Sequence, residues 1–227
     1  MRILILGGTR FLGRKVVENL LIRGHDLTVL SRRKTNLPTA VRFVLAERVN
    51  GLNNLVGENF DIVLDFICYN EIDIKQLTHT INMKQYILIS TIWVSKLKSC
   101  LSSNKNFIIS KLTRLELPIV TKNYLLGKIC AEAYLPELNK RGIQSVALRL
   151  PIVLGNGDHT GRLEFYCRRL LDGGPLIIIN SGKNTVQIAS LDDIAKVIVL
   201  WLENIDITIY PIWDALPGKG RNVFETL

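Results

Sequence analysis

Short apolar runs rich in β-branched residues alternate along this chain with longer stretches in which apolar residues recur every three or four positions. The short runs predict buried strands, because a strand that is covered on both faces is apolar at successive positions. We expect strands at Arg2–Leu6, Leu27–Leu30, Val41–Leu45, Asp61–Phe66, Gln85–Ser90 and Gln144–Leu150, and a last one at Ile207–Trp213.

The longer stretches predict amphipathic helices between these strands. The first has apolar residues at positions 12, 16, 17, 20 and 21, and Gly24 is placed to close it. A late helix around Ile194 is expected to be capped by Asp192 or Asp193. Further helical faces contain Ile74, Leu125 and Leu163, and the second of these is expected to end near Pro136 and Gly142.

Strands and helices in this order require parallel strand pairing through right-handed crossovers. We therefore predict an α/β fold with a doubly wound parallel sheet of the Rossmann type. In such a sheet a ligand binds beyond the carboxyl ends of the strands. The segment Ser95–Asn123 departs from the pattern, because its basic residues face a single acid, Glu116. We expect it to form a basic, surface-exposed insertion between the fifth strand and the next helix.

The composition narrows the class of protein. The chain has 227 residues, of which 48% are hydrophobic and 22% charged, which excludes an intrinsically disordered protein. No apolar run approaches the roughly 18 residues of a membrane span. Basic residues at positions 10, 14 and 15 interrupt the apolar start, so we expect no signal peptide and a cytoplasmic location. The formal net charge of +9 is compatible with binding to nucleic acid or polyphosphate, although many soluble enzymes are equally basic.

The cysteines do not suggest a metal site. Cys68, Cys100, Cys130 and Cys167 lie far apart, without a C-x-x-C pair or a nearby histidine. We expect reduced thiols that act as small apolar side chains, and no bound metal.

A glycine-rich turn, Gly7-Gly8-Thr9-Arg10-Phe11-Leu12-Gly13, joins the first predicted strand to the first predicted helix. In that context Gly7 permits a tight turn, Gly8 lets the backbone approach a pyrophosphate, and Gly13 lets the helix pack closely. The pyrophosphate would lie at the positive end of the helix dipole. The turn therefore predicts a dinucleotide site, with a purely structural turn as the alternative.

The end of the second strand discriminates between dinucleotides. An acid there would accept a hydrogen bond from a ribose 2′-hydroxyl and favour NAD(H). This chain instead continues as Ser31-Arg32-Arg33-Lys34. Because an arginine can hold a phosphate through two hydrogen bonds, we predict NADP(H) in preference to NAD(H).

A tyrosine and a lysine stand four residues apart at Tyr124 and Lys128, which places them on one helix face. The pair opens the helix after the fifth strand, and Thr91 lies at the end of that strand. Taken with the glycine turn, this arrangement resembles the extended and atypical short-chain dehydrogenases/reductases, the NAD-dependent epimerase/dehydratase group. The variant GGTRFLG, with Arg10 at the place of the middle glycine, is similar to a branch that includes chloroplast stem-loop RNA-binding proteins.

The resemblance implies an enzyme that oxidises, reduces, epimerises or dehydrates at a carbinol carbon, often of a nucleotide sugar. Tyr124 would move a proton, Thr91 would bind the substrate oxygen, and Lys128 would hold the nicotinamide ribose. A phenol is a poor base at neutral pH, so a nearby ammonium is expected to lower the pKa of Tyr124. The resemblance also places Glu47 at the adenine, although a solvated loop charge is an equal alternative, and Phe66 beside the cofactor.

The resemblance further implies a dinucleotide-binding core with the active-site residues over 1–150 and a partial substrate lobe over 151–227. Relatives usually continue further, so the substrate half is expected to be abbreviated, with 222–227 beginning a helix. Arg162 has two interpretations, a partner for an anionic substrate or a solvated arginine at a helix start. A homodimer is compatible with the sequence, and no membrane partner is expected.

Two alternatives remain open. The first is a protein that kept the nucleotide fold and binds RNA through its basic insertion. Phe107 is the only aromatic residue between Lys96 and Asn123, which weakens this alternative, because single-strand recognition uses stacking platforms. The second is a decayed enzyme that binds the cofactor without turnover.

Overall fold

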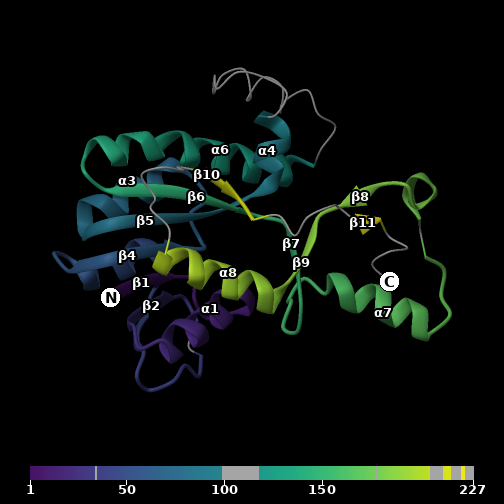
Figure 1. Ribbon diagram of the computed structural model, residues 1–227, viewed down its shortest axis with the longest axis horizontal. Coiled ribbons are helices and arrows are strands. Elements are labelled where there is room, and N and C mark those ends of the chain that lie inside the picture. The colour runs from purple at the N-terminus through teal and green to yellow at the C-terminus, as the bar shows by residue number, and fades with distance from the viewer. Residues whose placement is uncertain (34, 99–117, 177, 205–211, 216–220, 223–227) are drawn as a thin grey trace.

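A computed structural model describes residues 1–33, 35–98, 118–176, 178–204, 212–215 and 221–222. Its centre is a seven-stranded sheet in the order β10-β6-β5-β4-β1-β2-β3 (Figure 1). All of its pairings are parallel. The predicted doubly wound sheet is thereby confirmed. The strands are β1 (Arg2–Leu6), β2 (Asp26–Ser31), β3 (Arg42–Leu45), β4 (Asn59–Asp65), β5 (Asn82–Thr91), β6 (Gln144–Leu150) and β10 (Ile212–Asp214).

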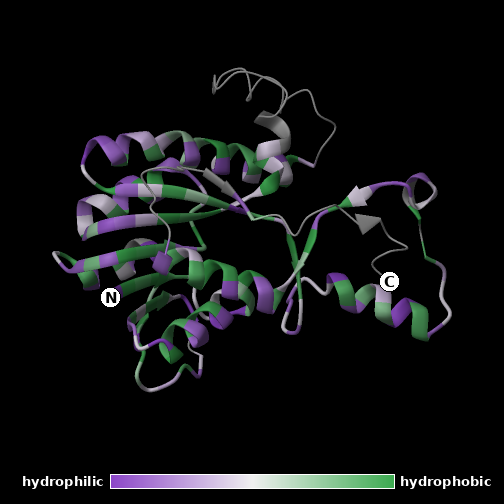
Figure 2. Cartoon of the chain, in the orientation of Figure 1, coloured by the Kyte–Doolittle hydropathy of each residue, from purple (hydrophilic) through white to green (hydrophobic). Residues whose placement is uncertain are grey.

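Both faces of this sheet are covered, which explains why its strands are apolar at successive positions. Within β1, Ile3 and Ile5 belong to one buried cluster, whereas Leu4 and Leu6 belong to the other. On the first face lie α1 (Phe11–Ile22) and α8 (Leu191–Asn204), and on the second α3 (Glu71–Thr80) and α6 (Ile119–Lys140). The green segments of Figure 2 follow the strands through the centre. The short elements are α2 (Arg48–Leu52), η1 (Asn53–Leu55) and α4 (Ile92–Lys98).

A smaller part lies to one side of the sheet (Figure 1). There β7 (Ile152–Leu154) pairs in parallel with β9 (Ile188–Ser190), and β8 (Thr185–Val186) pairs antiparallel with β11 (Arg221–Asn222). This part also contains η2 (Ile179–Gly182) and α7 (Arg162–Leu171). No residue of α7 is buried, and Arg162 at its start forms an ion pair with Asp158 at 3.2 Å.

Three expectations about helix ends need correction. The helix α6 begins at Ile119, inside the predicted insertion, whereas its end at Lys140, close to Gly142, is as expected. Ser190, rather than an aspartate, caps α8, since its Oγ accepts from the backbone N–H of Asp193 at 3.2 Å. Asn222, expected to begin a helix, ends β11 instead.

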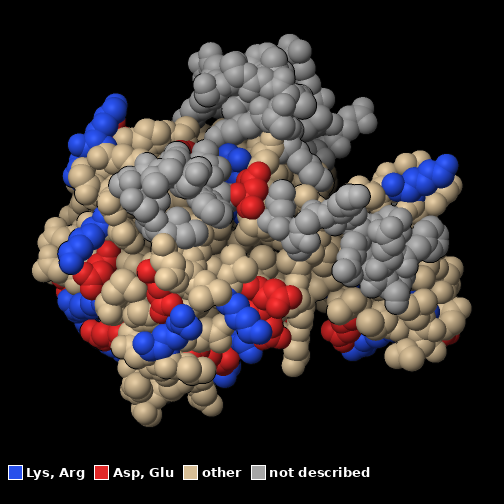
Figure 3. Space-filling view, viewed as in Figure 1, with Lys and Arg blue, Asp and Glu red and all other residues tan. Residues whose placement is uncertain are grey.

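Other expectations lie outside the described residues. They concern the centre of the basic insertion (99–117), Lys34, Cys100, 205–211 and 223–227. Within the described part of the chain, no helix is both long enough and apolar enough to cross a membrane. On the face shown in Figure 3, basic and acidic side chains lie next to one another over the large sheet, so opposite charges alternate there. Cys68, Cys130 and Cys167 are free thiols.

Candidate functional site

The order of the sheet reverses between β1 and β4, because β2 and β3 continue on one side and β5 and β6 on the other. In an open α/β sheet this switch point forms the crevice in which ligands bind. The glycine turn follows β1 at this point, and the backbone N–H of Gly7 donates to the carbonyl of Leu30 at 3.0 Å. Phe66, half-buried directly after β4, donates its N–H to the carbonyl of Leu6 at 3.0 Å.

Each of the three positions in the turn is restricted to glycine for a different structural reason. Gly7 has a φ of +90°, and a Cβ atom there would lie 2.6 Å from Ile67. At Gly13 a Cβ atom would lie 2.6 Å from the carbonyl oxygen of Gly7, so α1 can start this close to β1 only with glycine. A Cβ atom at Gly8 would lie 2.8 Å from Val17. Glycine at position 8 is therefore also required by core packing, a role that the sequence does not predict, whereas the approach of its backbone to a pyrophosphate stays a prediction.

The start of α1 suits an anion. Phe11 has a φ of 42°, a left-handed conformation that is costly for an aromatic residue and that recurs at functional sites. Arg10 precedes it in an extended conformation, and no side chain caps the helix. The first turn contains no acid, so neither a cap nor a carboxylate competes for its N–H groups. Arg10 is exposed, whereas Leu12 is buried.

The ends of β2 and β3 extend this region. Thr9 is buried, and its Oγ1 lies 2.9 Å from the Oγ of Ser31, which ties the turn to the end of β2. Arg32 and Arg33 are exposed, and among the described residues neither forms an ion pair. Glu47 is exposed too, and it follows Ala46, whose N–H donates to the carbonyl of Ser31 at 3.0 Å. The two arginines and the acid therefore stand at neighbouring strand ends.

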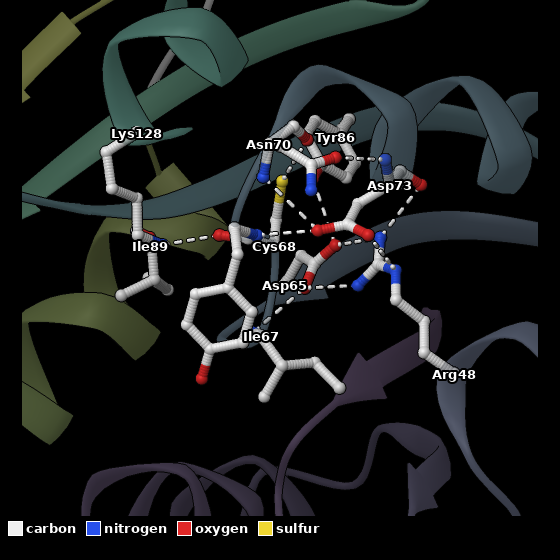
Figure 4. A network of polar contacts seen from close by, with 10 residues as sticks. Arg48, Asp65, Ile67, Cys68, Asn70, Asp73, Tyr86, Ile89 and Lys128 are labelled. Atoms are coloured by element: carbon white, nitrogen blue, oxygen red, sulfur yellow. Dashed lines mark hydrogen bonds and ion pairs between the residues drawn. The ribbon is translucent and has the colours of Figure 1, made fainter. Parts of the chain in front are cut away.

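Lys128 joins α6 to the ends of two strands. Its side chain is buried, and its Nζ donates to the carbonyl oxygens of Cys68 and Ile89, each at 2.7 Å. Cys68 follows β4, and Ile89 lies near the end of β5 (Figure 4). Burial lowers the pKa of Lys128, although nearby acidic groups oppose the change. An ammonium has three N–H donors, so these two bonds leave one donor for a ligand.

Tyr124 lies one turn before Lys128 on the same helix, and its side chain is 39% exposed. The distance from the Lys128 Nζ to the centroid of the Tyr124 ring is 5.8 Å. Burial raises the pKa of Tyr124, and Tyr69 raises it further. The expectation that the ammonium lowers this pKa is therefore wrong for this structure, because loss of solvation is the largest effect.

Thr91 ends β5, and its Oγ1 accepts from the N–H of Trp93 at 3.4 Å. No hydrogen bond joins Thr91 to Tyr124 within the described part of the chain. The preceding residue makes the closer link to α6, since the Ser90 Oγ donates to Glu132 at 2.7 Å. Arg149 of β6 completes this buried group through two hydrogen bonds to Glu132, at 2.9 and 2.5 Å. The sheet edge therefore holds α6 in place through Lys128 and Glu132.

Sequence reasoning missed a buried ion pair below the site, between Arg48 and Asp65 (Figure 4). The Arg48 Nη1 and Nη2 atoms donate to the two oxygens of Asp65 at 3.0 and 2.7 Å. Tyr86 also donates its hydroxyl to Asp65, at 3.0 Å. Burial alone would lower the pKa of Arg48, but the Asp65 carboxylate raises it. Burial raises the pKa of the neighbouring Cys68 thiol to about 12, so this thiol is protonated at neutral pH.

One signal pointed to this pair. Asp65 is the only charged residue in the apolar run 62–68, where a charge is costly unless it is paired.

The family model described as the NAD dependent epimerase/dehydratase family matches residues 3–212. The chain belongs to this family. Membership confirms the resemblance that the glycine turn and the Tyr124–Lys128 pair indicate, and the family is one of enzymes.

Several solved enzyme structures have the same fold. UDP-glucuronic acid 4-epimerase from Bacillus cereus, in complex with UDP-glucuronic acid and NAD, has a TM-score of 0.74 and 19% identity. That match covers 99% of this chain and 80% of the epimerase. The Bordetella bronchiseptica enzyme WbmF, in complex with NAD⁺, has a TM-score of 0.70 and 18% identity, covering 97% and 74%. These likenesses show the fold.

UDP-N-acetylglucosamine 4-epimerase from Methanobrevibacter ruminantium M1, in complex with UDP-N-acetylmuramic acid, has a TM-score of 0.71 and 18% identity. The match covers 99% of this chain and 79% of that enzyme. Among curated proteins, the chloroplast stem-loop binding protein of 41 kDa b from Arabidopsis thaliana is 25% identical over 222 residues. The match covers 89% of this chain and 55% of the relative, so the chain spans about half the length of that protein.

Proposed function

We propose that this protein is a nicotinamide-dependent epimerase, dehydratase or reductase that acts at a carbinol or carbonyl carbon of a small substrate. One observation carries the proposal. Lys128, one turn after Tyr124, donates to the carbonyl groups of Cys68, in the loop after β4, and of Ile89, near the end of β5. The Tyr124–Lys128 pair therefore lies at the same edge of the sheet as the glycine turn after β1, where a dinucleotide would span the switch point.

The residues at this edge fit a dinucleotide. The turn 7–13 would hold the pyrophosphate on the N–H groups of Phe11, Leu12 and Gly13. Arg10, Arg32 and Arg33 would surround a 2′-phosphate, which favours NADP(H). NAD(H) is the alternative, since Glu47 is the nearby acid and two similar structures contain bound NAD. Phe66 would border the cofactor, and the remaining Lys128 donor would reach a ribose hydroxyl.

The nicotinamide, when bound, supplies the hydride acceptor or donor. The chain's own groups would manage the substrate oxygen. Tyr124 would give a proton to that oxygen or take one from it, and Thr91 would hold the oxygen through a hydrogen bond. Because the pKa of Tyr124 is raised, its phenol is protonated at neutral pH and is prepared to act as an acid.

The proposed substrate class rests on the similar enzymes, and the positive charge of Arg162 is considered as a binding group for it. Three of the similar structures are of nucleotide-sugar 4-epimerases, so a nucleotide sugar is the substrate that we propose first. Arg162 is a weaker candidate for binding its anionic groups, because it already pairs with Asp158.

Tyr124→Phe tests the function. Loss of an acid–base group should lower turnover of a panel of UDP-sugars about 100-fold or more. Binding of NADPH, followed by its fluorescence, should remain unchanged. Tyr166→Phe, an exposed tyrosine of α7, is the matched control and should retain full turnover. Turnover by the Tyr124→Phe variant at the wild-type rate would rule out this assignment.

RNA binding is a second candidate, supported by the name of the Arabidopsis relative and by the net charge of +9. A phosphate-binding surface predicts an affinity for a stem-loop RNA that falls steeply with salt. Such binding should be the same in the Tyr124→Phe variant. Affinity that is independent of salt, or no binding at low ionic strength, would exclude this candidate.

A further inference from the structure

The loop after β4 places a second phenol beside Tyr124. The ring centroids of Tyr69 and Tyr124 are 6.5 Å apart, and their planes are inclined by 60°. Aromatic pairs attract one another in this range of distance and tilt. The Lys128 Nζ lies 5.6 Å from the Tyr69 centroid and 5.8 Å from that of Tyr124. The two rings therefore share one buried ammonium, at cation–π distance from each.

The backbone of Tyr69 is held from both sides. Its N–H donates to the Oδ2 atom of Asp73 at 2.7 Å, and the next residue, Asn70, caps α3 in a reciprocal capping box. Its carbonyl oxygen lies against Gly127, where an added Cβ atom would overlap it. Gly127 lies between Tyr124 and Lys128 on α6. Because glycine has no Cβ atom, it is the one residue type that permits this close approach to the Tyr69 loop.

The side chain of Tyr69, in contrast, contributes little to the core. It is 54% exposed, and it belongs to neither buried cluster. A large aromatic ring on a fixed backbone, exposed at the edge where the strands end, has no packing role that would explain it. The ring contacts that distinguish Tyr69 are those with the Tyr124 ring and the Lys128 ammonium.

We propose that Tyr69 is a positioning residue of the active site, whose ring holds the ring of Tyr124 above the Lys128 ammonium. The inference rests on the proposed function, because it concerns the orientation of the group that moves the proton. With its ring held, the Tyr124 hydroxyl keeps one direction toward a substrate oxygen. Tyr69 also acts on the titration of Tyr124, since it adds to the effect of burial in raising that pKa. The groups that act on Lys128 itself are Cys68, Asp65, Glu132 and Asp73.

Kinetics of two variants separate positioning from folding. Tyr69→Leu removes the ring and should lower kcat about 10-fold, the upper range for an aromatic pair, with unchanged NADPH binding. Tyr69→Phe keeps the ring and should restore kcat. It also removes the hydroxyl, so the pH profile of kcat should move to lower pH. Tyr134→Leu is the matched control, because Tyr134, on α6, is also a tyrosine beside a lysine. The Nζ atom of Lys75, on α3, lies 5.2 Å from its ring centroid. The control variant should leave kcat and the profile unchanged.

A second measurement does not depend on turnover. In chains with ¹³C-labelled tyrosine rings, the Tyr124 signal is assigned from its absence in Tyr124→Phe. Its titration should move to lower pH in Tyr69→Phe and Tyr69→Leu, and not in Tyr134→Leu. An unshifted Tyr124 titration, or a Tyr69→Leu variant with wild-type kcat, would overturn the role of Tyr69. If Tyr124→Phe retains turnover while the titration shifts, the proposed function fails and the coupling of the two rings stands.

Discussion

Arg48 and Asp65 form a two-pronged ion pair in the interior, with N–O distances of 3.0 and 2.7 Å. The pair links the start of α2 to the end of β4, directly below the loop that carries Cys68 and Tyr69. The side chain of Asp65 is fully buried, and that of Arg48 is 10% exposed. Neither charge has access to bulk water, so each depends on the other.

Removal of one partner should therefore be costly. Asp65→Asn removes the nearer carboxylate from the buried Arg48 charge, leaving only Asp73 at 3.7 Å, and should lower the free energy of unfolding by about 3–5 kcal/mol. Arg48→Met together with Asp65→Leu should cost less than Asp65→Asn alone, since no buried charge remains. Denaturant unfolding measures both. Lys84→Ala, which breaks the exposed pair with Asp61, is the control and should cost about 1 kcal/mol at most. An Asp65→Asn variant as stable as the control variant would contradict the prediction.

Replacement of Gly127 by alanine should change the stability in the direction opposite to that of an ordinary helical glycine. In an exposed helix interior, Gly→Ala stabilises by about 1 kcal/mol. Gly127→Ala should instead destabilise by about 1–3 kcal/mol, because the new methyl group overlaps the carbonyl oxygen of Tyr69. Ala133→Gly, at an exposed position of the same helix, is the matched reverse substitution and should cost about 1 kcal/mol. Thermal unfolding measures both, and stabilisation by Gly127→Ala would refute the close approach.

Acid should weaken the contact between α1 and α8. The guanidinium of Arg23, and then His25, lower the pKa of Glu203 from 4.5 to about 2. The folded state thus favours the carboxylate. Its contribution is fully present above pH 4.5 and is lost as the pH falls toward about 2. Glu203→Gln should cost about 1 kcal/mol at neutral pH, a value reduced for solvent screening, and nothing near pH 2.

The measurement for Glu203 is the free energy of unfolding as a function of pH. Arg23→Gln should remove the same pH-dependent difference, since it takes away the main partner. A constant difference between wild type and Glu203→Gln across this range would show that the carboxylate's charge contributes nothing.

The arginines after β2 should decide the choice of cofactor. Replacement of Arg32 and Arg33 by serine removes charge-assisted hydrogen bonds to a 2′-phosphate and should weaken NADPH binding about 10-fold or more. Binding of NADH, which lacks that phosphate, should change little. Arg168→Ser together with Arg169→Ser, in the exposed helix α7, removes the same two positive charges and is the control. Fluorescence titrations measure all of these, and equal losses for both cofactors would disprove the phosphate contact.

The sequence is most informative where one local signal suffices. The apolar runs correctly indicate β1, β2 and β4 to within a few residues, because strands buried on both faces leave a simple pattern. The glycine turn likewise requires only its own residues and the adjoining strand. The family resemblance draws on both.

Contacts between distant segments could not be predicted in this way. Lys128 meets two carbonyl groups 60 and 39 residues away, and backbone carbonyls carry no sequence signature. The packing role of Gly8 was missed for a similar reason, since it depends on contacts with Val17 and Ile5 that the turn itself does not indicate. The direction of the Tyr124 pKa shift depends on burial of the phenol and on the charge of the neighbouring Tyr69, both of which are properties of the packed structure.

The position of β10 in the chain determines when the edge of the large sheet can be completed during synthesis. Residues 212–214 pair with 147–149 at the edge of the large sheet, yet most of the smaller part, from β7 to β9, separates them in the chain. On the ribosome, β6 is synthesised long before its outer neighbour, and its open edge can pair with other chains during that interval. The sheet thus reaches its full width only after β7, β8 and β9 of the smaller part have been translated.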